Sequence, residues 1–388
     1  MYKNEDFIKE LLKCVRCGKC RAVCPEINLE EFQEESSPRG RIRMAYGLIT
    51  KKIPPTQILI DKIYSCFYCG ICQITCPSGV MTSDLILKTR EYLYDLGLSP
   101  NKVNNLLETI IKTKNIYGID QEDRLDWAFD VEDIIENKIN KKADIGLFIG
   151  CTASYKGSLA IQPESIVKIL DHLNIDFTLL GEKEMCCGNP YFLGGGAIND
   201  KIREIVLGNI ENFAKLQIKK LITACPGCYR IIKTIYPIIY GKELPFEVYH
   251  VTQYFDDLIN KNVLKLKKSI DLKLTYQDPC ELARHCGIFE QPRNIFEKIP
   301  GLKFFELTPN KDNAVCCGGG GLVKLTFPDI VDKQLKVKFN QISECNDKLD
   351  GIITACPSCQ DNLQYGNTLL KENLKIIDIC DLILRAIK

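Results

Sequence analysis

The second half of this chain contains a repeat, and that repeat is the strongest constraint on its fold. The stretch "TACPGCY" begins at Thr223, and the near copy "TACPSCQ" begins at Thr354, 131 residues later. Aligning the two copies also brings two Cys-Cys-Gly motifs into register, at Cys186 and at Cys316, 130 residues apart. Two similar domains of about 120 residues each are the simplest interpretation. We predict them over residues 143–265 and 266–388.

Each copy alternates short apolar segments with helical stretches. The predicted strands are 145–150, 177–180 and 220–224 in the first copy, and 272–276, 303–307 and 351–355 in the second. Helical stretches such as 164–174 and 198–216 lie between them. This alternation predicts two tandem α/β, Rossmann-like domains, each with a parallel sheet flanked by helices. The repeated cysteines follow strands or precede helices, which places them at the carboxyl edge of each sheet, where ligands bind.

Each copy carries five thiols in the same order. They are Cys151, Cys186, Cys187, Cys225 and Cys228, then Cys280, Cys316, Cys317, Cys356 and Cys359. Because a tetrahedral zinc ion takes four ligands, five exceed one zinc site, whereas adjacent cysteines can bind separate irons of a cluster. Gly188, Gly318 and Gly319 would let the backbone approach that cluster closely. The alternatives are buried structural cysteines and, for the glycines, a phosphate-binding loop.

The first 100 residues contain two further cysteine runs. "CVRCGKCRAVCP" and "CFYCGICQITCP" both read C-x2-C-x2-C-x3-C-P, the pattern of ligands to cubane [4Fe–4S] clusters, in which the fourth cysteine of each run ligates the other cluster. We therefore predict one cluster on Cys14, Cys17, Cys20 and Cys76, and another on Cys66, Cys69, Cys72 and Cys24. Zinc is the alternative, although zinc ligands usually come as two separated pairs.

The 41 residues between Cys24 and Cys66 are too many for a minimal ferredoxin hairpin and suit inserted helices. Within them, Ser36 or Ser37 can cap a helix that has Pro38 in its first turn. We predict an α-helical ferredoxin domain over 1–100 and a charged helical linker over 101–142.

Composition indicates where such a chain works. It has 388 residues and 21 cysteines, no apolar run of about 18 residues, and a polar start, "MYKNEDFIKE", that does not suit a secretory signal. We expect a cytoplasmic protein that reaches a membrane only through a partner. In a reducing compartment, metal ligation is the favoured use of so many thiols. The net charge of +1 gives no indication of nucleic-acid binding.

These motifs resemble those of the heterodisulfide reductase family. The patterns C-x34-CC-G-x36-C-x2-C and C-x35-CC-G-x37-C-x2-C resemble its paired CCG domains, and "DPCELARH", Pro292–Arg293 and "IPGL" fit the second of these. "SPRGR" between the ferredoxin runs is similar to the α-helical ferredoxin of this family and of fumarate reductase iron–sulfur subunits. The likeness covers nearly the whole chain, in the domain order of the family's D subunit.

The resemblance implies two non-cubane [4Fe–4S] clusters, one on each five-cysteine set. These ten cysteines would be the catalytic site that reduces the mixed disulfide of coenzymes M and B, and two cubane [4Fe–4S] clusters would feed it. It also implies a redox partner: a cytochrome b, a flavoprotein, or a hydrogenase or formate dehydrogenase module. Candidate anchors for the anionic substrate are Arg230, Arg284, Arg293, Lys183 and Lys324.

Two other functions fit parts of the pattern. One is the electron-transferring subunit of a flavin-linked 2-hydroxy acid (glycolate or lactate) or glycerol-3-phosphate dehydrogenase, which shares this architecture. The other is a cluster-bearing scaffold or maturation factor in methanogenesis. The C-x2-C pair is intact in both copies, which favours the disulfide-cleaving type. Among the histidines, His285 could face the site, and His250 is predicted to be a core residue.

Overall fold

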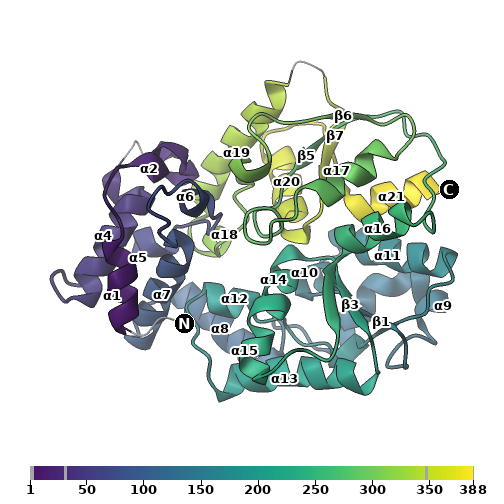
Figure 1. Cartoon of the computed structure of the whole chain (residues 1–388), viewed down its shortest axis with the longest axis horizontal. Helices are drawn as coiled ribbons and strands as arrows, with labels where there is room; N and C mark the ends of the chain where they lie inside the picture. The colour runs from purple at the N-terminus through teal and green to yellow at the C-terminus, as the bar shows by residue number, and fades with distance from the viewer. Residues whose placement is uncertain (1–3, 30–32, 346–347, 388) are drawn as a thin grey trace. The chain divides into compact units, whose positions relative to one another are not determined.

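The computed structural model describes residues 4–29, 33–345 and 348–387 (Figure 1). The first three residues of the polar N-terminal stretch lie outside this range. The chain divides into two units, each treated separately below. Unit 1 takes the chain up to Glu108 together with Pro190–Ala197 and Pro309–Asn340, and unit 2 takes Thr109–Asn189, Ile198–Thr308 and Gln341–Lys388.

Unit 1 begins with the helical segment that was predicted as a ferredoxin domain. Its helices are α1 (Asn4–Leu12), α2 (Lys19–Val23), α3 (Pro25–Leu29), η1 (Glu34–Ser36), α4 (Pro38–Ile49), α5 (Gln57–Tyr64), α6 (Ile71–Ile74), α7 (Thr82–Asp95) and most of α8 (Asn101–Thr113). The predicted cap is confirmed, because Ser37 Oγ accepts a hydrogen bond from Gly40 N at 2.9 Å and Pro38 is the first residue of α4. Phe7, Leu11 and Leu85 are among the residues of its small core.

Two segments from the repeat also belong to unit 1. They carry most of α12 (Asn189–Leu193), η5 (Lys311–Asn313), α18 (Val323–Thr326) and most of α19 (Pro328–Ser343). α6 lies against η5, and Lys333 Nζ donates a hydrogen bond to the carbonyl of Leu29. Unit 1 is therefore built from stretches of chain that are far apart in sequence.

Unit 2 contains two parallel sheets of identical topology. In the first, β1 (Ile145–Phe148), β2 (Phe177–Leu179), β3 (Lys220–Thr223) and β4 (Glu247–His250) lie in the order β2-β1-β3-β4. In the second, β5 (Lys273–Gln277), β6 (Lys303–Phe305), β7 (Gly351–Thr354) and β8 (Lys375–Asp378) lie in the order β6-β5-β7-β8. The predicted fold class is confirmed, and the repeat in sequence is a repeat in structure.

Helices connect the parallel strands in each half of unit 2. The first half has α10 (Cys151–Tyr155), η3 (Gly157–Leu159), α11 (Ile161–His172), η4 (Gly181–Lys183), α13 (Asp200–Lys215), α14 (Pro226–Thr234), α15 (Tyr236–Tyr240) and α16 (Val251–Asn260). The second half has α17 (Glu290–Glu297), α20 (Pro357–Leu369) and α21 (Ile379–Ile387).

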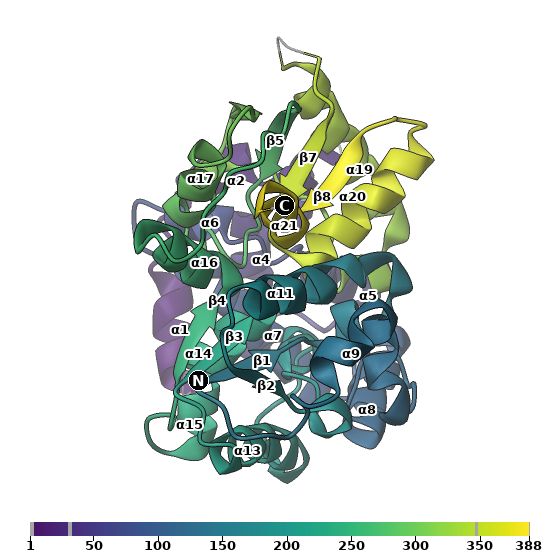
Figure 2. The same ribbon diagram turned by 90° about the vertical axis from the view of Figure 1, so that its right-hand side faces the viewer.

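The two halves of unit 2 share one core. α11 packs against α21 and α16 packs against α17, so the helix between the first two strands of each half contacts the last helix of the other half (Figure 2). Gln162 Nε2 donates to Asp378 Oδ2 at 2.6 Å in this joint, and Lys156 Nζ lies 2.5 Å from Asp361 Oδ1. The halves therefore form one body.

The segment predicted as a helical linker is helical. It contains the whole of α8, then η2 (Glu122–Val131) and α9 (Glu132–Ile135). Trp127, Val131 and Ile135 are buried in the core of unit 2, so this stretch packs on the first half of the repeat. Within the described ranges, every helix is too short or too polar to cross a lipid bilayer.

Candidate iron–sulfur sites

The first ferredoxin set lies near the surface of unit 1. Cys17 is exposed, and Cys14, Cys20 and Cys76 are half-buried. Burial and then the neighbouring Cys14, Cys76 and Cys17 thiols together raise the pKa of the Cys20 thiol to about 11. The structure thus brings together the four thiols that the sequence groups on one cluster.

The second ferredoxin set lines a cavity in unit 1. Cys24, Cys66, Cys69 and Cys72 all border it, together with Arg41. Burial raises the pKa of Cys24 to about 12, with Arg41 opposing this shift. Cys24 lies with the second run and Cys76 with the first, as the exchange of fourth cysteines predicts. Their ligation of iron stays a prediction.

Two arginines beside this cavity are fully buried. Arg41 forms an ion pair with Glu26, and its Nη1 donates to the carbonyl of Ser36 at 2.8 Å. Arg90 comes from α7 and donates five hydrogen bonds, all to backbone carbonyls. Neither arginine was predicted from the sequence to be a functional residue. "SPRGR" contains Arg41, whereas nothing in the local sequence distinguishes Arg90 from a solvated helix residue.

The five thiols of the first repeat lie next to one another at the carboxyl edge of their sheet. Hydrogen bonds link Cys151 to Cys186, Cys186 to Cys187, Cys187 to Cys228, and Cys228 to Cys225. Cys151 follows β1, while Cys225 caps α14 and places Cys228 in its first turn. The hydrogen bond from Cys186, and then that from Cys228, lower the pKa of Cys187 to about 6.

Glycines support this array of thiols. Gly188 has φ +89° and donates its backbone N–H to Cys186 Sγ at 3.4 Å. In the second repeat, Gly318 has φ +82° and donates to Cys316 Sγ at 3.3 Å. At Gly150, a Cβ atom would lie 3.1 Å from Cys228 Sγ. These positions favour glycine because they need a left-handed backbone, and at Gly150 a side chain would also crowd the thiol.

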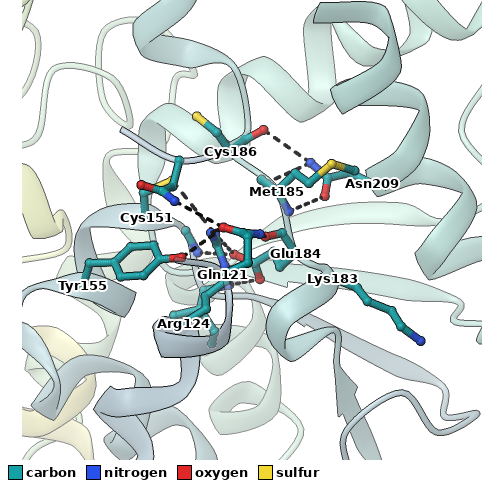
Figure 3. Close-up of polar contacts among 12 residues, drawn as sticks. Gln121, Arg124, Cys151, Tyr155, Lys183, Glu184, Met185, Cys186 and Asn209 are labelled. Carbon is teal, nitrogen blue, oxygen red and sulfur yellow. Dashed lines mark hydrogen bonds and ion pairs between the residues drawn. The ribbon is translucent and has the colours of Figure 1, made fainter. Parts of the chain in front are cut away.

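A buried ion pair fixes the turn before Cys151 (Figure 3). Glu184 accepts hydrogen bonds from the backbone N–H groups of Ile149 and Gly150 at 2.9 and 2.8 Å, and Arg124 Nη2 lies 2.6 Å from its carboxylate. The same Nη2 is 3.9 Å from Cys151 Sγ. Asn209 holds the loop before Cys186, because its Oδ1 accepts a hydrogen bond from the backbone N–H of Met185 at 2.9 Å. Sequence reasoning did not single out Arg124 or Glu184, because a lone charged residue carries no local signal of burial.

The five thiols of the second repeat are divided between the units. Cys316 and Cys317 lie in unit 1, and Cys280, Cys356 and Cys359 lie in unit 2. Cys356 caps α20 as Cys225 caps α14, and both Cys356 and Cys359 lie close enough to Tyr276 to raise the pKa of its hydroxyl, although burial is the main cause. That these five form one set stays a prediction from the repeat. The role of Gly319 beside a cluster also stays a prediction.

The candidate substrate anchors have different environments. Arg293 is buried and binds both Asp278 and Glu306, so it serves the fold and is not available for an anion. Lys183 is exposed and points away from the thiols in Figure 3. Arg230 is half-buried and forms an ion pair with Glu281. Arg230 lies two residues after Cys228 in the first half of unit 2, and Glu281 directly follows Cys280 in the second half. Arg284 and Lys324 are half-buried, as is His285.

His250 is a core residue, as predicted. Its Nδ1 lies 2.8 Å from Thr252 Oγ1, and its Nε2 lies 3.2 Å from the carbonyl of Ala224. Burial lowers the pKa of His250 to about 3, so the ring is neutral.

The chemistry of these thiol groups fits iron–sulfur clusters. Within residues 4–29, 33–345 and 348–387, no three thiol, imidazole or carboxylate groups converge on one point. Ligands of a four-iron cluster bind different irons, so they are expected to be spread in this way. Backbone N–H groups donate to several of the sulfurs, as at Cys66, Cys76 and Cys187, which stabilises thiolates.

Comparisons with known proteins agree with this architecture. Residues 10–80 match the 4Fe-4S dicluster domain family, and residues 145–233 and 274–364 match the cysteine-rich domain family. The D subunit of the dihydromethanophenazine:CoB–CoM heterodisulfide reductase of Methanosarcina acetivorans is 37% identical over 98% of this chain and 95% of that protein. The corresponding protein of Methanosarcina barkeri is 36% identical, also over 98% of this chain and 95% of that protein.

More distant relatives carry other names. The B subunit of the CoM/CoB fumarate reductase of Methanothermobacter marburgensis is 28% identical over 98% of this chain and 74% of that protein. The EtfAB:quinone oxidoreductase of Syntrophomonas wolfei is 26% identical over 99% of this chain and 60% of that protein. The similarity with the D subunits extends over almost the full length of both chains. The chain is therefore an iron–sulfur oxidoreductase that belongs to the family of heterodisulfide reductase D subunits.

Proposed function

We propose that this chain reduces the mixed disulfide of coenzymes M and B to its two thiols, at a pair of non-cubane [4Fe–4S] clusters held by the two five-cysteine sets. The observation that carries the proposal is the complete five-thiol array of the first repeat, with the same five residues in register in the second. The S–S bond takes up two electrons and two protons, and each sulfur leaves as a thiol.

Two cubane [4Fe–4S] clusters on the ferredoxin sets would supply these electrons from a redox partner. When bound, iron–sulfur centres transfer single electrons and offer irons with high affinity for sulfur. The protein's part is to hold each centre. Cys17 lies at the surface, which suits electron entry, and the second set is more buried. The relatives' names as subunits support a partner, which we propose to be a cytochrome b, a flavoprotein, or a hydrogenase or formate dehydrogenase module, with any membrane contact made through it.

Residues of the first repeat would orient this site. Glu184 and Arg124 fix the turn before Cys151, and Asn209 fixes the turn before Cys186. Arg230 lies within reach of both halves of unit 2 through Glu281 and Asn189, which makes it the best placed of the candidate anchors for an anionic substrate.

The test compares Cys225→Ser, Cys356→Ser and the double variant in anaerobic turnover of the heterodisulfide with a reduced viologen. If both clusters act on one substrate, each single change should lower the rate at least about 100-fold, and the double variant should be little worse, because residues that act as a unit are not additive. Cys345→Ser, outside every motif, is the control.

Iron content is measured in each variant so that loss of the fold is recognised. Near-normal turnover in either folded single variant would overturn the two-cluster mechanism. If the protein without substitutions does not reduce the disulfide but exchanges electrons with a flavoprotein dehydrogenase, that result would support the electron-transferring role instead.

A further inference from the structure

Arg90 is a buried cation whose contacts go well beyond its own helix. Its side chain is fully buried, and Nη2 donates to the carbonyl of Cys66 at 2.8 Å. Nη1 donates to the carbonyls of Leu193 at 2.8 Å and Gly321 at 2.9 Å. One guanidinium thus ties a turn of the second ferredoxin set to the two loops that follow the Cys-Cys pairs, all within unit 1.

Those loops approach the ferredoxin turn so closely that only glycine fits. A Cβ atom at Gly321 would lie 2.2 Å from the carbonyl oxygen of Cys66, and one at Gly320 would lie 2.8 Å from that of Phe67. A Cβ atom at Gly195 would lie 2.6 Å from the Arg90 carbonyl oxygen. The loop that carries Cys316 and Cys317 therefore packs backbone to backbone on the turn after Cys66.

The charge of Arg90 is also unbalanced. Arg41, the other buried guanidinium at this cavity, is paired with Glu26, whereas the hydrogen-bond partners of Arg90 within the described chain are five neutral carbonyls. At the first ferredoxin set, Arg39 binds the carboxylate of Glu34 through Nε at 2.7 Å and Nη2 at 2.9 Å. Glu34 also lies 3.5 Å from Arg21 Nε, and all three side chains are partly exposed to solvent. The buried set therefore has a fully buried positive charge with no carboxylate partner within the described chain, whereas the arginines at the exposed set share a carboxylate near the surface. A buried charge is screened far less than a charge in water.

We propose that Arg90 is a positioning residue for electron transfer: its charge raises the reduction potential of the centre on Cys24, Cys66, Cys69 and Cys72, and its hydrogen bonds hold the Cys316–Cys317 loop against that centre. The inference rests on the proposed clusters. Burial alone disfavours the additional negative charge of a reduced cluster and would lower its reduction potential. A nearby fixed cation stabilises that negative charge and would raise the potential. Electrons entering at the exposed centre would then move on to the buried one and reach the second repeat there.

The test is an anaerobic redox titration followed by paramagnetic resonance, with Cys17→Ala and Cys69→Ala used to assign each wave to its centre. Arg90→Met should lower the ratio of reduced to oxidised buried centre at least tenfold at a fixed potential, equivalent to about 59 mV for a one-electron couple. The exposed centre should keep its potential. Arg90→Lys should restore most of the shift, since it keeps the charge.

Lys88→Met is the matched control. It removes a cation from the same helix, but one paired with Glu91 near the surface, so the buried centre should not respond. Glu26→Gln tests the same electrostatics without touching Arg90 and should shift the buried centre in the opposite direction, which covers the case in which Arg90→Met fails to fold. An unchanged potential in folded Arg90→Met or in Glu26→Gln, with both centres present, would overturn the inference. Absence of the centres from the unchanged protein would overturn the proposed function instead.

Discussion

At the scale of single residues, several charged side chains of this protein are fully buried, and burial changes their properties. Asp378 is an example away from the thiols. It lies in the joint between the halves of unit 2, where Gln162 and the backbone N–H of Cys380 donate to it. Burial raises the pKa of Asp378 to about 6. The folded chain therefore prefers its protonated form, and stability from this group is lost as the pH rises through about 6.

Asp378→Asn should remove this loss. From pH 4 to pH 8, the free energy of unfolding of the variant relative to the unchanged chain should rise by roughly 2.5 kcal/mol, because 1.36 kcal/mol accompanies each unit of pKa shift and a part of the effect is already lost at pH 4. The packing is preserved, because Gln162 Oε1 has no hydrogen-bond partner within the described chain and can accept from the new amide after the Gln162 side chain turns over. Anaerobic unfolding at several pH values measures this. Asp381→Asn, in the first turn of α21, is the control, and an equal change in both variants would refute the assignment.

At the scale of elements, segments of unit 1 approach one another so closely at several places that only glycine fits at the contact. Gly40 lies in the first turn of α4, and a Cβ atom there would lie 1.9 Å from the carbonyl oxygen of Glu34. η1 and α4 can pack in this way only around glycine. Because α4 also carries Arg41, any displacement of the helix reaches the cavity of the second ferredoxin set.

Gly40→Ala should therefore destabilise the chain by about 2 kcal/mol or more, in the range of overpacked sites, and reduce iron incorporation. Gly157→Ala is the matched control, since a Cβ atom there meets nothing within 4 Å. Urea unfolding and iron analysis of the two variants provide the comparison. Equal stability of both would mean that η1 moves aside at little cost.

The elements were largely predictable from sequence, and the buried charges were not. Each predicted strand is a short apolar run that occurs twice, and "SSP" predicts the start of α4 by a local hydrogen bond. The position of Cys24 beside the cysteines of the second run, and of Cys76 beside those of the first, was also predictable, because the C-x2-C-x2-C-x3-C-P spacing is typical of paired clusters that exchange their fourth ligand. Arg90 and Arg124 differ: on a helix a lone arginine has the same local pattern whether it is solvated or buried. Their partners lie up to 231 residues away, so tertiary packing alone reveals them.

At the scale of the whole molecule, the thiols predict a total of bound metal. Four [4Fe–4S] clusters would amount to about 16 irons per chain. Anaerobic iron and sulfide analysis of the purified protein checks this. A value near eight irons, with only cubane signals present, would mean that the repeats hold no clusters of this kind and would remove the proposed catalytic site.

Unit 1 takes its Pro309–Asn340 segment from late in the chain, which bears on how the protein is made. About 270 residues separate Cys66 from the end of that segment. At about 5–20 residues per second, the ribosome needs roughly 14 to 55 s to cover this distance. During that interval the turn after Cys66 has been synthesised, but Gly320 and Gly321, whose backbones pack against it in the folded protein, have not. We therefore expect iron to reach the second ferredoxin set most easily in this interval. Slowing translation between the two segments should then increase the yield of protein that contains all of its iron.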